Sequence, residues 1–520
     1  MSKLLKLGNS IFFLFGSLWL YFSVYFLFQY LNIDYTNLTN GWASLLLGIA
    51  LGIFLLFHFK EKAGLWGSKL ASWLNRHKGI VFFVMLGFQL FVTLTSVRLA
   101  SSDSTIVYMM ATNKEFALTN DYISINPNNF LLVIWMKINH LIFGTNTILA
   151  LALWNIFFLD ASICFLYQTN KAFLKKGIAD ISFFLLVHIL GFSSQYIYIY
   201  SDPIALFFLS LSLYLFGFAI KKNLDWKFFL GSGFVFSIAN GFRPTVLIFA
   251  IAGLIVMANH LFFKKRAMNL KKLLQSSIVF LLAFFSLTFL QDYTLNHQNI
   301  VKYEENKSRT LLYYIDLGLT YTGNNHAEIP EEVRLAEGKD RSKSALRDIS
   351  KRLKDYQYSS FVGHVFYKYY WMTGEGMFGW YQERILREDS HLDSPWLKRF
   401  QGWNISKYVR SFIYVEGQHY FYYASLIQIF WILISLGIFV YPFYYREKNY
   451  QLWMQIGVFG ALLFLLIFEA GRSRYLIQFL PAILTVSACG LYGLWTSLHT
   501  LTKGVVNDDT KTIHNRTLLQ

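Results

Sequence analysis

Long apolar runs recur along this chain, and their length restricts what it can fold into. Runs close to 20 residues alternate with short polar segments over most of the 520 residues. An apolar helix of about 20 residues spans the hydrocarbon core of a bilayer. The runs are continuous, whereas the strands of a membrane β-barrel alternate apolar and polar residues in segments of about ten. The sequence therefore predicts an all-α protein that crosses a membrane many times.

The apolar runs predict about twelve transmembrane helices. They cover Ile11–Leu31, Ala43–Phe59, Ile80–Val97, Thr147–Tyr167, Ile181–Tyr200, Ile204–Ile220, Phe228–Ala239, Thr245–Phe263, Ser276–Gln291, Tyr420–Tyr444, Leu452–Phe468 and Leu476–Leu498. A further run, Phe130–Phe143, is shorter and follows a turn at Pro127. It suits an interfacial or re-entrant helix better than a full crossing.

The pattern divides the chain into four segments. Residues 1–291 form an N-terminal transmembrane module with a polar loop at 98–146, residues 419–502 hold the last transmembrane helices, and 503–520 form a polar tail. Residues 292–418 are rich in charge and lack a spanning run, which predicts a small α-rich domain outside the membrane. Within this domain, the aromatic stretch around Lys368–Phe378 suits either sugar stacking or a membrane-interface belt.

Lysine and arginine set the predicted orientation. The net charge is +17 although only 15% of the residues are charged, and much of the excess lies in short clusters between apolar runs. Such clusters mark cytoplasmic loops. Both termini are therefore predicted to be cytoplasmic and the loop 98–146 extracytoplasmic, and the distribution of charge argues against a nucleic-acid partner.

Motifs for several common chemistries do not occur in the sequence. It has no GxxxxGK[ST], HExxH, CxxC or GxSxG pattern, so P-loop ATP hydrolysis, zinc proteolysis and serine hydrolysis have no support. Its two cysteines, Cys164 and Cys489, both lie within apolar runs. They predict neither a disulfide framework nor a metal cluster.

The predicted topology gathers charged residues on the outer side of the membrane. They are Asp103, Asp121, Asp202, Arg243, Glu469, Arg472 and Arg474. A carboxylate can deprotonate an attacking hydroxyl, and arginine binds phosphate through two parallel hydrogen bonds. Together they suit group transfer from a phosphate-linked donor in the membrane to a hydroxyl outside. Structural roles stay open: Asp202 can cap the helix that follows, Glu469 can pair with Arg472 or Arg474, and Asp121 can be an ordinary loop acid.

Short motifs spread over nearly the whole chain form an ordered set. They are Asp103 in an outer loop, the Pro-Asn-Asn turn of Ile125–Asn129, Tyr200-Ser201-Asp202-Pro203, Gly241–Thr245, Lys368–Phe378, and Glu469–Leu476 followed by Pro481. This set resembles the membrane-embedded glycosyltransferases of the GT-C type, in particular those of Gram-positive bacterial membranes, which use polyprenyl-phosphate sugars.

The resemblance implies a multi-pass cell-membrane enzyme with a GT-C-like fold. Its donor would be an undecaprenyl-phosphate-type sugar, and its acceptor an extracytoplasmic cell-wall polysaccharide, teichoic acid or glycolipid. Asp103 would be the general base, with Asp121 as a weaker second acid. The donor phosphate would be bound by Arg243, Arg472, Arg474 and Lys368. The donor and acceptor groove would be lined by Asn126, Pro127, Asn128, Asn129, Asp202, Glu469 and Tyr475.

Cofactors and alternative functions are less constrained. The family often has paired acids in the first large outer loop, so the resemblance suggests a magnesium or manganese ion as a cofactor. Serines flank Asp103 in this chain, however, and no metal ligand is assigned. A transporter or flippase for lipid-linked sugars would use the same arginines without needing Asp103 as a base. A non-catalytic membrane scaffold is the third alternative.

Overall fold

Helices account for nearly all of the regular structure in the part of the chain that is described. The structure is a computed structural model and describes residues 2–31, 58, 69–70, 72–263, 270–445, 448–468 and 471–497. Within these ranges the β-structure is limited to an isolated bridge between Leu99 and His391. The protein is thus an all-helical membrane protein, as the apolar runs predicted.

Ten of the described helical segments are long and apolar enough to cross a membrane. They are Lys6–Tyr30, Lys78–Ser96, Pro127–Phe173, Lys176–Ile197, Asp202–Lys221, Pro244–Leu261, Lys271–His297, Tyr420–Tyr444, Asn449–Ile467 and Ser473–Ser497. Two of the twelve predicted spans are not among them. Ala43–Phe59 lies outside the described residues except for His58. Phe228–Ala239 corresponds to α12 (Trp226–Phe242), whose 17 residues extend about 26 Å, short of a hydrocarbon core of about 30 Å.

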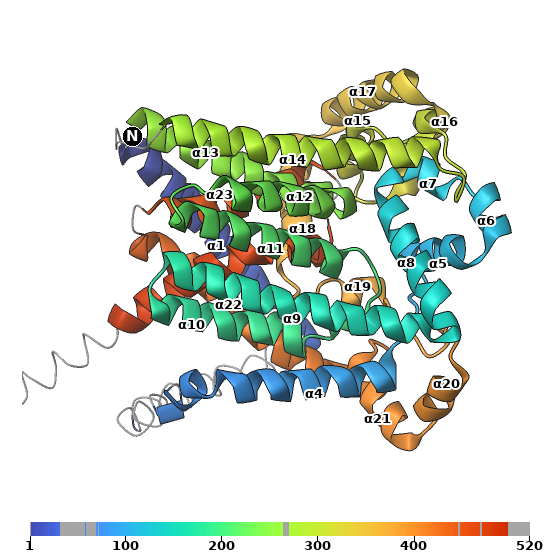
Figure 1. The fold of residues 1–520 in the computed structure, drawn as a ribbon, viewed down its shortest axis with the longest axis horizontal. Coiled ribbons are helices and arrows are strands. Elements are labelled where there is room, and N and C mark those ends of the chain that lie inside the picture. The colour runs from blue at the N-terminus through green and yellow to red at the C-terminus, as the bar shows by residue number, and fades with distance from the viewer. Residues whose placement is uncertain are drawn as a thin grey trace, which may run out of the picture.

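The long helices run side by side in one bundle (Figure 1). Besides α12 they are α1 (Ser2–Tyr30), α4 (Lys78–Ser96), α9 (Thr147–Phe173), α10 (Lys176–Leu186), α11 (Asp202–Lys221), α13 (Leu247–Phe263), α14 (Leu270–His297), α22 (Tyr420–Tyr444) and α23 (Asn449–Ile467). A last helix covers residues 480–497. The closest packing joins α11 to α12 and α9, α12 to α14, and α1 to α22. The outer face of α14 exposes Leu282, Phe285 and Phe289, as expected of a surface in contact with lipid.

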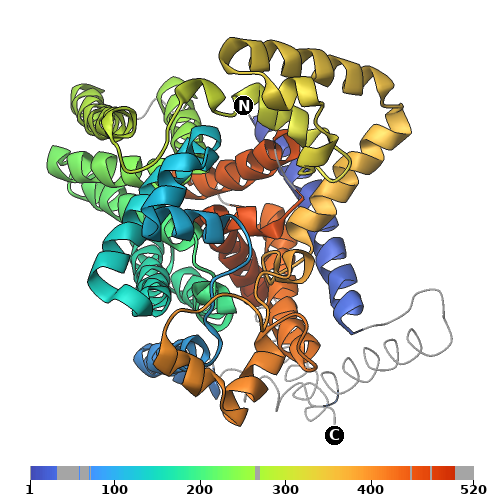
Figure 2. The same cartoon turned by 90° about the vertical axis from the view of Figure 1, so that its right-hand side faces the viewer.

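Short helices gather at one end of this bundle, where Figure 2 shows them face-on. The first group is α5 (Asp103–Thr112), α6 (Lys114–Thr119), α7 (Tyr122–Ile125), η1 (Pro127–Asn129) and α8 (Phe130–Phe143). The helix α8 has the predicted bounds and lies across the bundle end (Figure 1). Its 14 residues extend only about 21 Å. Gly144, with φ 51°, ends α8, and η2 (Gly144–Asn146) leads into α9.

Residues 292–418 divide between two packing environments. Their elements are η6 (Glu305–Lys307), α15 (Leu311–Gly318), η7 (His326–Glu328), α16 (Glu331–Leu335), α17 (Gly338–Asp355), α18 (Tyr358–Thr373), α19 (Trp380–Glu383), α20 (Pro395–Gln401) and α21 (Asn404–Ile413). The helices α15 to α17 enclose a small core of their own around Leu317 and Val333. In contrast, the C-terminal part of α18 packs against α1, where the hydroxyl of Tyr369 donates to the carbonyl of Phe15 at 2.8 Å. The aromatic stretch Lys368–Phe378 is therefore largely internal packing, a role that the sequence did not predict.

Candidate functional site

The chain unwinds just before α11 and delivers two tyrosines to the end of the bundle. After α10 it passes through a π-helix at Val187–Phe192 and a 3-10 turn at Ser194–Ile197. The side chain of Asn155 on α9 donates to the carbonyls of Tyr196 and Tyr198, both at 3.1 Å. These bonds satisfy backbone groups that a regular helix would have paired internally. They also fix the direction in which Tyr198 and Tyr200 leave the backbone.

Tyr200 lies at the centre of the candidate site. Its hydroxyl donates a long hydrogen bond of 3.5 Å to Oδ2 of Asp103 and accepts one of 3.3 Å from the amide of Asn129. The guanidinium carbons of Arg243 and Arg474 lie 4.9 and 5.4 Å from the centre of its ring. Positively charged guanidinium groups are attracted to the faces of aromatic rings. One tyrosine thus joins the start of α5, the turn η1, the end of α12 and the segment η8 (Ser473–Phe479).

Asp202 holds one of the two arginines. Its Oδ2 atom accepts from Arg243 at 3.0 Å, and Oδ1 accepts from the side chain of Gln478. Asp202 also stands in the first turn of α11, beside Pro203. Burial acts to lower the pKa of Arg243, but the Asp202 carboxylate and Tyr200 outweigh burial and raise the pKa above its ordinary value. Arg243 is therefore a permanent positive charge at this site.

Glu383 holds the other arginine. It pairs with Arg474 at 3.2 Å and with Arg472 at 3.4 Å, while Arg474 also donates to the hydroxyl of Tyr198 at 2.6 Å. The ring of Tyr475 lies 5.7 Å from the Arg474 guanidinium. Arg474 is buried, whereas Arg472 keeps 31% of its side-chain surface exposed. The two arginines of the Arg-Ser-Arg motif therefore share one carboxylate from different sides.

A buried carboxylate shapes the loop that carries Glu383. Glu375 accepts the backbone N–H of Gly379 at 3.0 Å and of Tyr381 at 2.9 Å. Phe378 has a φ of 53° and Gly379 a φ of 85°, so the chain turns sharply at these two residues. Burial raises the pKa of Glu375 to about 7. The loop geometry thus depends on a group whose charge changes near neutral pH.

Some buried polar atoms of the site lack a hydrogen-bond partner in the part of the chain that is described. Among the described residues, the Nε atoms of Arg243 and Arg474 are buried and make no hydrogen bond, and neither does Oδ1 of Asn129. Buried polar atoms are nearly always paired with protein or water. Two guanidinium groups at one tyrosine give this site the positive charge that attracts an anion such as a phosphate.

Metal ligands are not grouped in the same way. In the described ranges, no set of three or more His, Cys, Asp or Glu side chains could hold a metal ion. Among the described residues, Asp103 accepts a hydrogen bond from the Tyr200 hydroxyl and pairs with no second carboxylate. This donor set does not fit a magnesium or manganese ion.

Comparison with known proteins shows which family the chain belongs to. A family model described as "conserved hypothetical integral membrane protein" matches residues 2–491. The chain belongs to this family. The protein is thus an integral, multi-pass membrane protein. A search of curated proteins finds no match. Among solved structures, the chain is similar to ArnT from Cupriavidus metallidurans in the apo state, with 12% identity, a TM-score of 0.30, and coverage of 80% of this chain and 78% of that chain.

The structure brings together most of the residues that the sequence singled out in this family member. Asp103, Asn129, Asp202, Arg243, Arg472, Arg474 and Tyr475 all lie in the cluster around Tyr200 and Glu383. Pro127 and Asn128 belong to the turn η1, which ends at Asn129. Glu469 lies outside the described residues.

Two predicted residues belong to a surface network instead. The carboxylate oxygens of Asp121 pair with Lys302 at 2.7 Å and with Lys307 at 3.2 Å. Hydrogen bonds from these lysines, chiefly Lys302, hold the pKa of Asp121 below its ordinary value. The amide oxygen of Asn126 accepts from Arg309 at 3.1 Å. These contacts tie α7 to the chain after α14.

Lys368 is buried in the packing between α18, α15 and α23. Its ammonium donates to the carbonyls of Gly318 at 2.8 Å, Leu466 at 2.8 Å and Phe468 at 3.0 Å. An ammonium has three donors, and three backbone carbonyls lie within hydrogen-bond distance of this one. The structure therefore gives Lys368 a role in joining helices, and we do not include it among the donor contacts.

Sequence reasoning missed Tyr198, Glu383 and Gln478, and it cited Tyr200 only within a motif. The Tyr-Ser-Asp-Pro motif was a usable signal for Tyr200, because it opens a span beside an acid. Glu383 had no comparable signal. It reaches the arginines only because Phe378 and Gly379 turn the chain, which composition cannot show.

Proposed function

We propose that this membrane protein is a GT-C-type glycosyltransferase that moves a monosaccharide from an undecaprenyl-phosphate-type lipid to a hydroxyl of an extracytoplasmic envelope acceptor. The acceptor class is a cell-wall polysaccharide, a teichoic acid or a glycolipid. One observation carries the proposal: a carboxylate, the buried Arg474 and the largely buried Arg243 meet at Tyr200. The resemblance of the motifs named above supports the choice of donor.

The proposed reaction uses each group once. The acceptor oxygen attacks the anomeric carbon of the sugar, and the bond from that carbon to the phosphate oxygen breaks. Asp103 takes the proton from the acceptor hydroxyl. The leaving lipid phosphate gains negative charge, which the positive charges of Arg243 and Arg474 beside Tyr200 stabilise.

Exposure of the groups fits these roles. Asp103 is exposed, so an acceptor in water can reach it. The side chain of Arg243 is 13% exposed and that of Arg474 is 5% exposed, so a phosphate bound there is largely shielded from water. Electrostatic stabilisation of a leaving group is strongest where water is excluded. The acceptor would therefore come from the aqueous side and the donor from the lipid.

The test uses purified full-length protein in nanodiscs, a polyprenyl-phosphate sugar and candidate acceptors. Asp103→Asn should lose at least a hundredfold in transfer and keep donor affinity within twofold. Asp121→Asn is a matched control, because it removes an acid from the same outer segment but away from the arginines. Normal transfer by Asp103→Asn would refute the assignment of the base.

Two further results separate this proposal from a transporter or flippase. Arg474→Gln should weaken donor binding by about tenfold or more, since it removes a buried charged donor. Protein in sealed vesicles that moves the lipid-linked sugar across the bilayer without consuming it would favour transport. In that case Asp103→Asn would leave the movement unchanged.

A further inference from the structure

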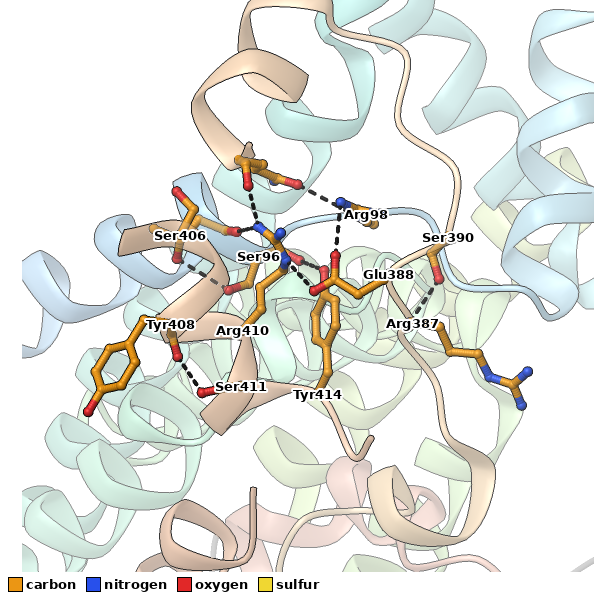
Figure 3. A network of polar contacts seen from close by, with 12 residues as sticks. Ser96, Arg98, Arg387, Glu388, Ser390, Ser406, Tyr408, Arg410, Ser411 and Tyr414 are labelled. Atoms are coloured by element: carbon orange, nitrogen blue, oxygen red, sulfur yellow. Dashed lines mark hydrogen bonds and ion pairs between the residues drawn. The ribbon is translucent and has the colours of Figure 1, made fainter. Parts of the chain in front are cut away.

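A second polar site lies near the first, between the end of α4 and the segment from Glu388 to Arg410. It is a groove of about 490 Å³. Its lining residues are Arg98, Glu388, Asp389, Ser390, His391, Leu392, Lys398, Gln401, Gly402, Lys407 and Arg410. Figure 3 shows the polar network beneath it. The volume falls within the range of about 300–1,000 Å³ typical of ligand sites.

The floor of the groove is fixed by hydrogen bonds to the end of α4. Arg410 donates to the carbonyls of Thr95 and Gln401, both at 2.9 Å. The side chain of Gln401 donates to the carbonyl of Val97 at 3.0 Å and accepts from Arg98 at 3.2 Å. Unpaired carbonyls at a helix C-terminus favour positive charge. The two arginines therefore serve first to hold this segment against α4.

The groove keeps positive charge after these structural pairs are counted. Glu388 pairs with Arg98 at 3.4 Å and with Arg410 at 2.8 Å, so one carboxylate faces two guanidinium groups. Lys398 and Lys407 add two exposed ammonium groups. The remaining acid in the lining is Asp389. Lining of this kind attracts an anion.

The groove lies close to Asp103 along the chain. Arg98 lines it, and only four residues separate Arg98 from Asp103. Five steps of extended chain span at most about 18 Å, which bounds the distance between the two Cα atoms. The intervening backbone is held in place, because Leu99 donates to the carbonyl of His391 at 2.8 Å. One extended ligand can therefore contact both sites.

We propose that this groove binds a phosphodiester of the acceptor. The acceptor would then be an anionic polymer or an anionic lipid, not a neutral glycan. A phosphodiester carries one negative charge that suits the pair Lys398 and Lys407, and its neighbouring unit would reach Asp103. This inference rests on the proposed function only in naming the ligand as the acceptor. Binding of the phosphodiester itself does not depend on transfer.

The experiment measures binding to full-length protein in phosphatidylcholine nanodiscs. The probe is a soluble, fluorescently labelled glycerol-phosphate hexamer. The variant Lys398→Glu/Lys407→Glu should bind it about tenfold more weakly than the unmodified protein, and added salt should reduce the difference. Lys351→Glu/Lys354→Glu is the matched control, because both lysines are exposed on α17 and lie outside the groove. It should bind within twofold of the unmodified protein.

A second arm identifies the source of the phosphodiester. Nanodiscs with phosphatidylglycerol are used, and lipid retained by the protein is counted by native mass spectrometry. Retention that depends on Lys398 and Lys407, without binding of the hexamer, would assign the groove to a lipid headgroup. If neither probe distinguishes the groove variant from the control, the proposal is wrong. Donor binding by Arg474→Gln is measured separately and tests the proposed function, because Arg474 does not line the groove.

Discussion

Replacing Lys368 with Met separates a structural role from a donor-binding role. The substitution removes an ammonium that donates to three backbone carbonyls and puts an apolar side chain of similar length in its place. The carbonyl of Gly318 keeps a second partner, the His364 ring at 3.0 Å. The carbonyls of Leu466 and Phe468 would each lose their bond to Lys368.

The expected cost follows from these two carbonyls. A buried polar group without a partner costs about 1–3 kcal/mol, so two cost about 2–6 kcal/mol. We therefore expect a loss of about 4 kcal/mol in unfolding free energy. In a chain of this size that loss lowers the melting temperature by about 4 °C. Donor affinity at low temperature should stay within twofold of the original.

The assay combines thermal unfolding in detergent with donor binding well below the transition. Lys339→Met is a suitable control, because Lys339 is exposed on α17 and undergoes the same chemical change. It should leave the melting temperature unchanged. A tenfold loss of donor affinity in Lys368→Met, with an unchanged melting temperature, would refute the structural assignment and restore Lys368 as a phosphate contact.

Three further predictions concern acids. Burial raises the pKa of Glu375 in the folded protein from 4.5 to about 7, so between these pH values the folded protein holds a proton that the unfolded chain releases. The unfolding free energy should therefore fall by about 3 kcal/mol as the pH rises from 4.5 to 7. Glu375→Gln should remove this pH dependence, which is measured as the melting temperature against pH. Glu383→Gln should lower the melting temperature, since it leaves the buried Arg474 guanidinium without its carboxylate partner. The pKa of Asp121 is lowered, so its ion pairs stabilise the fold at neutral pH and this stabilisation is lost on acidification. Asp121→Asn should lower the melting temperature only slightly, and added salt should reduce the difference.

The helices could be predicted from the sequence because hydrophobic length is a local property. The run Tyr420–Tyr444 and the shorter run Phe130–Phe143 have the bounds of α22 and α8. The π-helix and 3-10 turn before Tyr200 could not be predicted in the same way. Asn155, on another helix, supplies hydrogen bonds to the carbonyls of Tyr196 and Tyr198 at the end of this unwound segment. Hydropathy contains no information about such a partner.

The candidate site shows the same division between local and distant information. An arginine next to a span end is visible as an exception to the charge pattern, which identified Arg243 and Arg474. Whether a charged residue meets a ligand or a structural partner depends on distant segments. Lys368 looked like the arginines in the sequence, but it donates to carbonyls of α15, of α23 and of the residue after α23.

The origin of Glu383 bears on how the two halves of the chain depend on each other. Asp103 and Arg243 come from residues 1–291, Arg474 comes from the C-terminal helices, and Glu383 comes from the segment between them. Because the C-terminal part of α18 packs against α1, the loop that carries Glu383 is anchored to the membrane helices themselves. Without Glu383, Arg474 would lose its carboxylate partner in a buried environment, where an unpaired charge is costly. The segment 292–418 is thus a structural part of the arginine site. An N-terminal half expressed alone would lack both Glu383 and Arg474, the ion pair on one side of this site.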